Sequence, residues 1–154
     1  MKTSITKLEA ILWSIALPGF PQLLVGLWFK GALLVLLEIF INVMSDFNLA
    51  IMYSFLGETK KAAGVIDYQW LMFYPCLYMF AMWDAYKIAS NEKEKLSYLP
   101  FVFSAYFVTV GLMVSPKVHL FGAFIGPIFL PMLFVIPGVA VGFLARAIVI
   151  RFTR

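Results

Sequence analysis

Five long apolar stretches, separated by short polar connections, restrict most strongly what this chain can fold into. A helix needs roughly 20 apolar residues to cross a hydrocarbon core of about 30 Å, and the last four stretches have about that length. Because 63% of the 154 residues are hydrophobic, against about 45–50% in soluble domains, a water-soluble fold could not bury them all. We therefore predict an all-α integral membrane protein that forms a single membrane domain, residues 1–154, in contact with the lipid bilayer. The stretches cover approximately residues 8–28, 31–56, 68–88, 98–115 and 120–149.

The first apolar stretch is interrupted in its middle by the sequence ALPGFPQLLVG. Pro18 and Pro21 each remove a backbone donor and Gly19 frees the backbone, so we expect a turn here. The apolar pieces on either side of the turn are each too short to span a membrane. Residues 8–28 are therefore predicted to form a re-entrant or interfacial helical segment, with Gln22 as a local partner for the polar groups that the turn leaves free. One kinked span is the alternative.

The lysines and arginines distinguish a returning first segment from a crossing one. If the segment returns, nine basic residues lie on one side of the membrane and three on the other; if it crosses, the split is five to seven. Because cytoplasmic loops carry an excess of lysine and arginine, the charges favour the return. We therefore predict four transmembrane helices after the first segment, with both chain termini in the cytoplasm. The nine residues are Lys2, Lys7, Lys30, Lys87, Lys93, Lys95, Arg146, Arg151 and Arg154, and the three are Lys60, Lys61 and Lys117.

Acidic and amide residues within the apolar stretches form one candidate site. Glu38, Asn42 and Asp46 recur every four positions and therefore share one face of a helix, while Asp84 lies near the cytoplasmic end of the third stretch. Charged groups inside a span are costly and often functional, so one interpretation is a polar track for protons or cations. The other interpretation, which we favour, pairs Glu38 and Asp84 with lysines such as Lys30 at the cytoplasmic surface and places Asp46 at the outer boundary.

Besides the first, three apolar stretches are candidates for an interruption, and in the third Pro75 is expected to introduce a kink. The second either continues as one helix to residue 56 or ends near Ser45–Asn48, with the remainder along the outer surface. The fifth would form a straight helix of about 45 Å, which is longer than the core. Breaks are therefore expected at Pro127 and at Pro137–Gly138.

Two Gly-x-x-x-Gly pairs in the fifth stretch are candidate helix-contact faces. Glycines at this spacing allow two membrane helices to approach closely. The contact partner is either another helix of the same chain or a helix of a second protein. The pairs are Gly122 with Gly126 and Gly138 with Gly142.

The remaining polar residues indicate no catalytic, cofactor or metal site. One cysteine, Cys76, and one histidine, His119, provide no metal-ligand spacing, and neither a nucleophile motif nor a phosphate-binding loop is present. The basic residues lie between apolar stretches, as orientation signals do, rather than in a patch typical of nucleic-acid binding. The sequence SNEKEK, residues 90–95, is interpreted as a solvated connection. We predict no cofactor, no metal and no nucleic-acid partner.

Two segments resemble a known group of membrane proteins. Residues 17–31, LPGFPQLLVGLWFKG, and residues 68–87, which end in WDAYK, resemble the PGxGQ-type opening and the WDAY-type close of small multipass bacterial proteins related to the two-transmembrane-span domain superfamily. The resemblance covers about residues 1–90. It implies a helical membrane fold and a bacterial cytoplasmic membrane, and it supplies no catalytic residues.

The function predicted from these features is that of a non-enzymatic accessory or scaffold protein. It would act through helix–helix contacts with a membrane-protein partner or with a second copy of itself. The alternative is a small transporter or an ion or proton pathway that uses the acidic residues of the apolar stretches.

Overall fold

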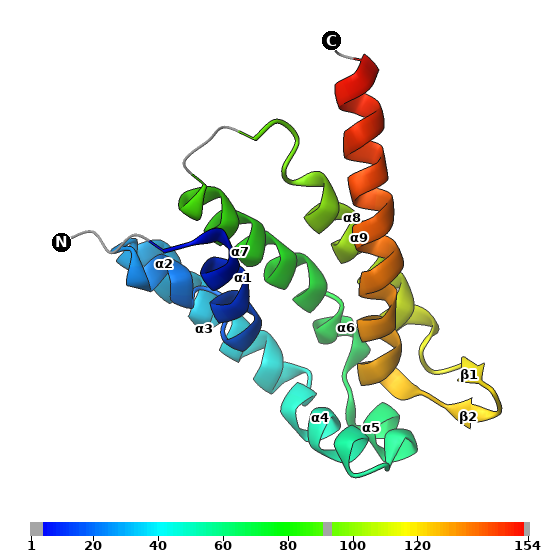
Figure 1. Cartoon of the computed structure of the whole chain (residues 1–154). Helices are drawn as coiled ribbons and strands as arrows, with labels where there is room; N and C mark the ends of the chain where they lie inside the picture. Colours follow the sequence, from blue (N-terminus) through cyan, green and yellow to red (C-terminus); the bar gives the residue numbers. More distant parts are fainter. Residues whose placement is uncertain (1–4, 91–93, 153–154) are drawn as a thin grey trace.

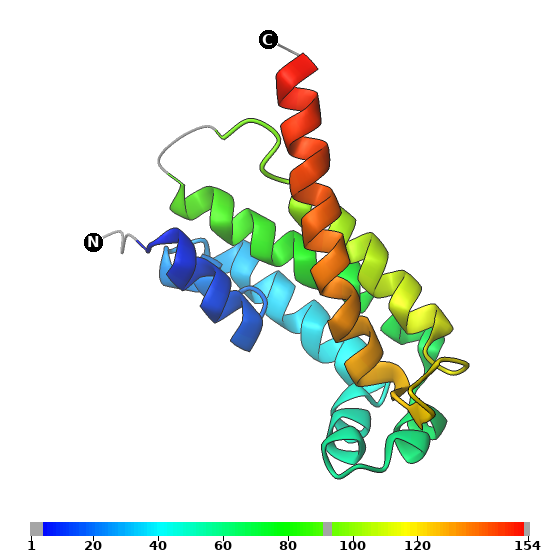
Figure 2. The same ribbon diagram turned by 45° about the vertical axis from the view of Figure 1, so that its right-hand side comes forward.

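The computed structural model describes residues 5–90 and 94–152, which are mostly helical, as the all-α prediction requires (Figures 1 and 2). Two strands of two residues each pair as a small hairpin. In chain order the elements are α1 (Lys7–Ala16), α2 (Phe20–Leu24), α3 (Trp28–Met44), α4 (Phe47–Phe55), α5 (Thr59–Val65), α6 (Tyr68–Leu71), α7 (Tyr74–Ala89), α8 (Leu99–Val114), β1 (His119–Leu120), β2 (Ala123–Phe124) and α9 (Gly126–Phe152).

The first two helices form a hairpin that turns at the predicted Pro-Gly-x-Pro sequence. A capping box between Thr6 and Glu9 starts α1, and Gly19 adopts a φ of 97° that L side chains rarely tolerate. Ile5, just before α1, packs with Val25, just after α2, and with Ala85 of α7. The beginning and the end of this segment therefore lie at the same end of the molecule, and the segment turns back on itself.

The second apolar stretch is two helices rather than one. α3 ends at Met44, α4 begins at Phe47, and the two axes differ by 67°. Asp46 adopts a left-handed conformation with φ 53°, and the hydroxyl of Ser45 donates to the carbonyl of Ile41. The prediction of one helix over residues 31–56 is therefore wrong, because polar side chains end α3 where the alternative placed its end.

The third stretch is also interrupted, whereas the fourth forms one helix, although that helix is too short to count as a candidate span. α6 and α7 are separated at Met72 and Phe73, with Pro75 in the first turn of α7, where the missing backbone N–H has no helical partner in any case. α8 covers residues 99–114, close to the predicted 98–115.

The fifth stretch begins later than predicted and continues through its prolines. Residues 119–124 form the β-hairpin, and α9 starts at Gly126 instead of residue 120. The break predicted at Pro127 coincides with the start of α9, whereas the break predicted at Pro137–Gly138 is absent, since α9 continues past Pro131 and Pro137. Pro127 lies in the first turn, where it costs no hydrogen bond. Tight packing of α8 against α9 near both internal prolines, at Gly111 and Gly138, holds the helix together there.

Within residues 5–90 and 94–152, α9 is long and apolar enough to cross a membrane by itself, and α3 with α4 adds a second span if the bent pair is counted as one. The described helices thus include one clear candidate for a membrane-spanning helix, not four. Taken alone, a single such helix is weak support for a membrane protein. However, a soluble core helix would be mostly buried, and only 28% of the most apolar window of α9 is buried in this fold.

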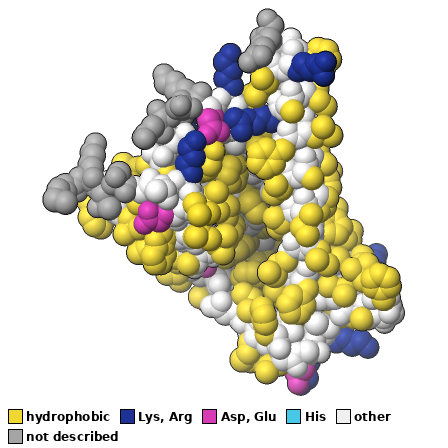
Figure 3. All heavy atoms as spheres, in the orientation of Figure 1, with side chains coloured by type: hydrophobic (Ala, Val, Ile, Leu, Met, Phe, Trp, Pro, Cys, Tyr) yellow, Lys and Arg dark blue, Asp and Glu magenta, His cyan; other side chains and the backbone are white. Residues whose placement is uncertain are grey.

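Most of the charged side chains visible in Figure 3 lie towards two ends of the molecule. The start of α1 and the end of α9 lie towards one end, while α5 and the β-hairpin lie at the other (Figures 1 and 2). Between the ends the visible surface is predominantly hydrophobic (Figure 3). Lys2, Lys93 and Arg154, which also entered the charge comparison, lie outside the described residues.

Candidate functional site

A groove with a volume of about 780 Å³ opens between α7 and the pair formed by α8 and α9. This volume is within the range of about 300–1,000 Å³ typical of small-molecule sites, and the hollow is visible between the two parts of the molecule in Figure 3. Residues from α1, α4, α7, α8 and α9 line it, and nearly all of them are apolar or aromatic. We refer to this feature as the groove.

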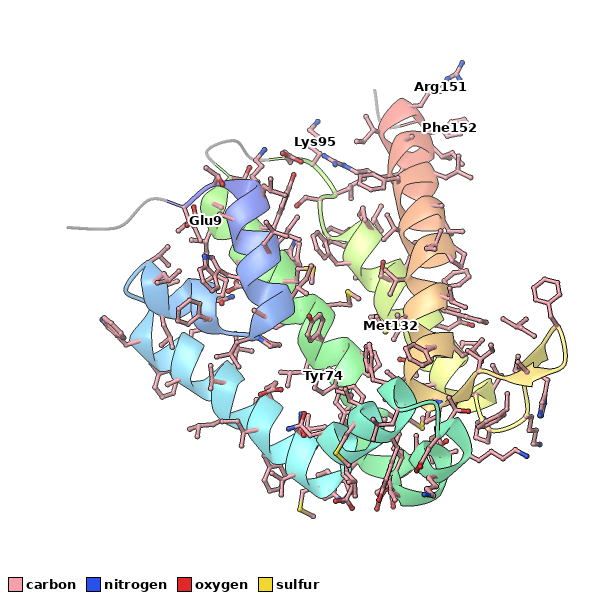
Figure 4. All side chains as sticks on the ribbon, turned by 60° about the horizontal axis from the view of Figure 1, so that its bottom comes forward. Glu9, Tyr74, Lys95, Met132, Arg151 and Phe152 are labelled. Atoms are coloured by element: carbon pink, nitrogen blue, oxygen red, sulfur yellow. The ribbon has the colours of Figure 1, made fainter. Side chains whose placement is uncertain are left out.

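The long walls of the groove come from α7 and α9. Tyr74 and Tyr78 lie one helical turn apart on α7, and their rings stack at 5.5 Å between centroids. Met132, Val135 and Val139 recur at three- and four-residue spacing on α9 and therefore form one face. Tyr74 and Met132 lie on opposite sides of the groove (Figure 4).

Several lining side chains lack the apolar cover that a core residue has. Met132 is 58% exposed, and Phe143, further along α9, is 54% exposed. Ile15 of α1 and Phe55 of α4 are also more than half exposed at the groove. Because these groups face a concave surface rather than a packed interior, an apolar ligand would bury them without a change of fold.

One end of the groove is polar, and Glu94 organises it. Tyr86 of α7 donates its hydroxyl to the Glu94 carboxylate at 3.0 Å, and Nη2 of Arg146 of α9 donates at 3.2 Å. Lys7 of α1 forms a short ion pair with the same carboxylate, and Nε of Arg146 donates to the carbonyl of Lys95 at 3.0 Å. We call Lys7, Tyr86, Glu94 and Arg146 the Glu94 clasp, since they link α1, α7 and α9.

The electrostatics of the clasp favour an ionised Glu94. The hydrogen bond from Lys7 is the largest cause, followed by that from Tyr86, and together they lower the pKa of the Glu94 carboxyl from its usual value of 4.5. The expectation that residues 90–95 form a solvated connection is therefore wrong at Glu94, which is partly buried. Residues 91–93 of that connection lie outside the described part of the chain.

A second polar cluster joins the N-terminal turn to α7. Gln22 is fully buried, and its amide donates to the carbonyl of Ala81 at 3.0 Å and to the carboxylate of Asp84 at 3.1 Å. Lys30 forms an ion pair with Asp84 at 2.8 Å. Gln22 thus joins the turn to α7, instead of forming hydrogen bonds with the free backbone groups of the turn itself as predicted. Pro18 and Pro21 are buried beside it.

The residues of the predicted polar track lie in separate contacts. Glu38 accepts a long hydrogen bond of 3.5 Å from Tyr74, Asn42 pairs with Asn48 at 3.2 Å, and Asp46 is exposed at the junction of α3 and α4. Asp84 belongs to the cluster with Lys30. Within the described residues, the hydrogen bonds among these groups do not connect the four into one path.

The two glycine pairs have different surroundings. A Cβ added at Gly138 would lie 2.7 Å from Cα of Ser104, and one at Gly142 would lie 2.4 Å from Cα of Pro100, so both glycines lie at the contact between α9 and α8. Gly122 is in the turn of the β-hairpin, and Gly126 begins α9 with a φ of 80°. These two glycines therefore do not form a helix face.

The groove and the Glu94 clasp were not predicted from the sequence, although part of the signal is present. The four-residue spacing of Tyr74, Tyr78, Met82 and Tyr86 places all four on one face of α7. The opposite wall and Glu94 come from segments far away in the chain, which the spacing within one helix does not reveal.

No protein-family model, no curated protein sequence and no solved structure matches this chain. The function proposed below therefore rests on the geometry of the chain and on its physical chemistry.

Proposed function

We propose that this protein is a non-enzymatic accessory protein of a bacterial cytoplasmic membrane that holds the apolar chain of a lipid in its groove. The observation that carries the proposal is a 780 Å³ groove lined by exposed apolar side chains and closed at one end by a charged cluster. An amphiphile has the same distribution of polarity, with an apolar chain and one polar end.

The membrane arrangement is part of the proposal. The four crossings are α3 with α4, α6 with α7, α8, and α9, while α1 and α2 form the re-entrant hairpin on the cytoplasmic side with both chain termini. Support comes from the hydrophobic surface between two charged ends (Figure 3). α8 has 16 residues and a length of about 24 Å, and a bilayer adapts to so short a helix by local thinning.

The proposed accessory role does not use the small-residue face of α9. Gly138 and Gly142 are covered by α8, so contacts with a membrane-protein partner or a second copy would use other faces of the helices. The ion pathway has less support, because the described acidic residues lie in separate contacts. A lipid held in the groove gives the protein a role that requires neither catalysis nor a continuous polar path.

Two valine-to-tryptophan variants on α9 test the proposal. Val139 lines the groove, whereas Val141, two residues further along, does not. The full chain is purified in mild detergent, and the lipid that remains bound is quantified by mass spectrometry per mole of protein. Val139→Trp should retain clearly less lipid than the native chain, because the indole fills the groove, and Val141→Trp should retain the native amount. Equal retention by both variants, or no retained lipid in the native chain, would refute the proposal.

A further inference from the structure

The groove has different chemistry at its two ends. At the far end its lining is apolar, with Phe47, Ile51 and Ile128. At the near end Tyr86 and Arg146 contribute a hydroxyl and a guanidinium, and Arg146 is the charged residue among the described lining residues. A bound amphiphile would therefore have one favoured direction, with its polar group at the end that holds Tyr86 and Arg146.

The groups that hold Glu94 are the groups that bind phosphate in proteins. A guanidinium presents five N–H donors in a planar fork that matches both carboxylate and phosphate, and the described contacts of Arg146 are made by Nε and Nη2. Tyr86 places its hydroxyl at 3.0 Å from both carboxylate oxygens of Glu94. The carboxylate thus occupies a position that suits an anionic headgroup at the mouth of the groove.

The length of the groove fits one leaflet of a bilayer. From Arg146 to Val135 there are 11 residues of helix, or about 16 Å at 1.5 Å per residue. Half of a hydrocarbon core of about 30 Å is about 15 Å. A chain whose polar group lies at Arg146 would therefore pass Val139 and Val135 within the depth of a single leaflet.

We propose that the groove binds an anionic phospholipid, whose phosphate replaces the Glu94 carboxylate at Arg146 and Tyr86. This inference rests on the proposed function and names the class of lipid that the groove takes. The polar group lies in the cytoplasmic leaflet, and the acyl chain lies between α7 and α9. Glu94 competes with the phosphate for the same donors, so its charge lowers the affinity for the lipid.

Competition by Glu94 leads to a result that a purely structural clasp would not give. Glu94→Gln removes the competing charge and should raise the affinity for an anionic lipid several-fold. If the carboxylate only held the helices together, its loss would leave binding unchanged or weaken it. Arg146→Gln should lower the affinity about tenfold, the scale of one charge-assisted hydrogen bond, and Arg146→Lys should keep the preference for an anionic lipid.

The experiment titrates the delipidated full chain, in neutral detergent, with phosphatidylglycerol or with zwitterionic phosphatidylcholine, and native mass spectrometry reports the bound fraction. Both lipids carry a phosphate, but the ammonium of phosphatidylcholine would lie beside the cations Lys7 and Arg146, so the native chain should prefer phosphatidylglycerol. Glu94→Gln should increase that preference, and Arg151→Gln, outside the groove, should not change it. Inorganic phosphate at equal concentration should not displace the lipid. Equal binding of the two lipids, no gain with Glu94→Gln, or displacement by inorganic phosphate would overturn the inference.

The failure of the headgroup inference is distinguishable from that of the proposed function. If Val139→Trp weakens binding of both lipids while the native chain binds them equally, the groove holds lipid chains without selecting the headgroup. If Val139→Trp weakens neither, the proposed function itself fails.

Discussion

Replacement of Gly142 by alanine should separate α9 from α8 and destabilise the wall of the groove. The added Cβ would lie 2.4 Å from Cα of Pro100 and 2.9 Å from the carbonyl oxygen of Leu99. Carbon atoms pack at about 3.5–4.0 Å, so the two helices would have to move apart by about 1 Å. The neighbouring atoms belong to the backbone and cannot rotate away.

The magnitude follows from comparison with a second helical glycine. Gly64 of α5 has no atom within 4 Å of the position where its Cβ would lie. Both substitutions gain about 0.8–1.0 kcal/mol of helix propensity, and only Gly142→Ala also incurs overpacking of about 1–3 kcal/mol. The difference between the two variants should therefore be about 1–3 kcal/mol, with Gly142→Ala the less stable.

The assay is reversible unfolding in mixed micelles of a mild detergent and sodium dodecyl sulfate, followed by circular dichroism. The full chain and both variants are compared at the same lipid and protein concentration, because bound lipid stabilises the folded state. A Gly142→Ala variant that is as stable as Gly64→Ala, or more stable, would refute the claim that backbone contact at this glycine holds α8 against α9.

Three further predictions concern the ion pair of Asp84, the charge of Glu94 and the orientation of the chain in the membrane. Asp84→Asn should lower the free energy of unfolding by about 1.5–3 kcal/mol, since the ion pair with Lys30 is lost. Unfolding in the same mixed micelles tests this prediction, and an unchanged free energy of unfolding would contradict it. The ionised Glu94 carboxyl contributes to the free energy of unfolding above its unfolded pKa of 4.5, and this contribution is lost as the pH falls through its lowered folded pKa. Glu94→Gln should therefore remove this part of the pH dependence of the free energy of unfolding, which unfolding at a series of acidic pH values measures. With the native cysteine removed, a cysteine at Lys61 should react with an impermeant reagent in intact cells, whereas one at Lys95 should not; the opposite pattern would reverse the proposed orientation.

The location of helix interruptions could be predicted from the sequence only in part. Pro18 and Gly19 mark the N-terminal turn because proline fixes φ and removes a backbone donor, while glycine permits a positive φ, and neither effect depends on distant residues. Pro131 and Pro137, by contrast, lie inside a continuous α9. Local propensity could not show that tight packing against α8 holds the helix together at these positions.

The division of the second stretch has a similar explanation. Hydropathy favours one helix through Asp46, and the sequence left open whether the helix ends there. Asn42 and Asn48 bond to each other across the junction, and the backbone N–H of Asp67 donates to the carbonyl of Ser45 at 3.2 Å. The last of these contacts connects residues more than 20 positions apart in the chain, so only the folded chain decides that α3 ends there.

The sequence by itself determined the composition of the surface, the helical class and the turn that sends the first segment back. These properties depend on apolar content and on backbone restrictions that act within a few residues. The groove and the Glu94 clasp were decided by the tertiary structure alone. Tyr78 and Val135 become opposite walls, and Glu94 reaches Lys7 and Arg146, because the packing of whole helices, rather than any local pattern, brings these distant residues together.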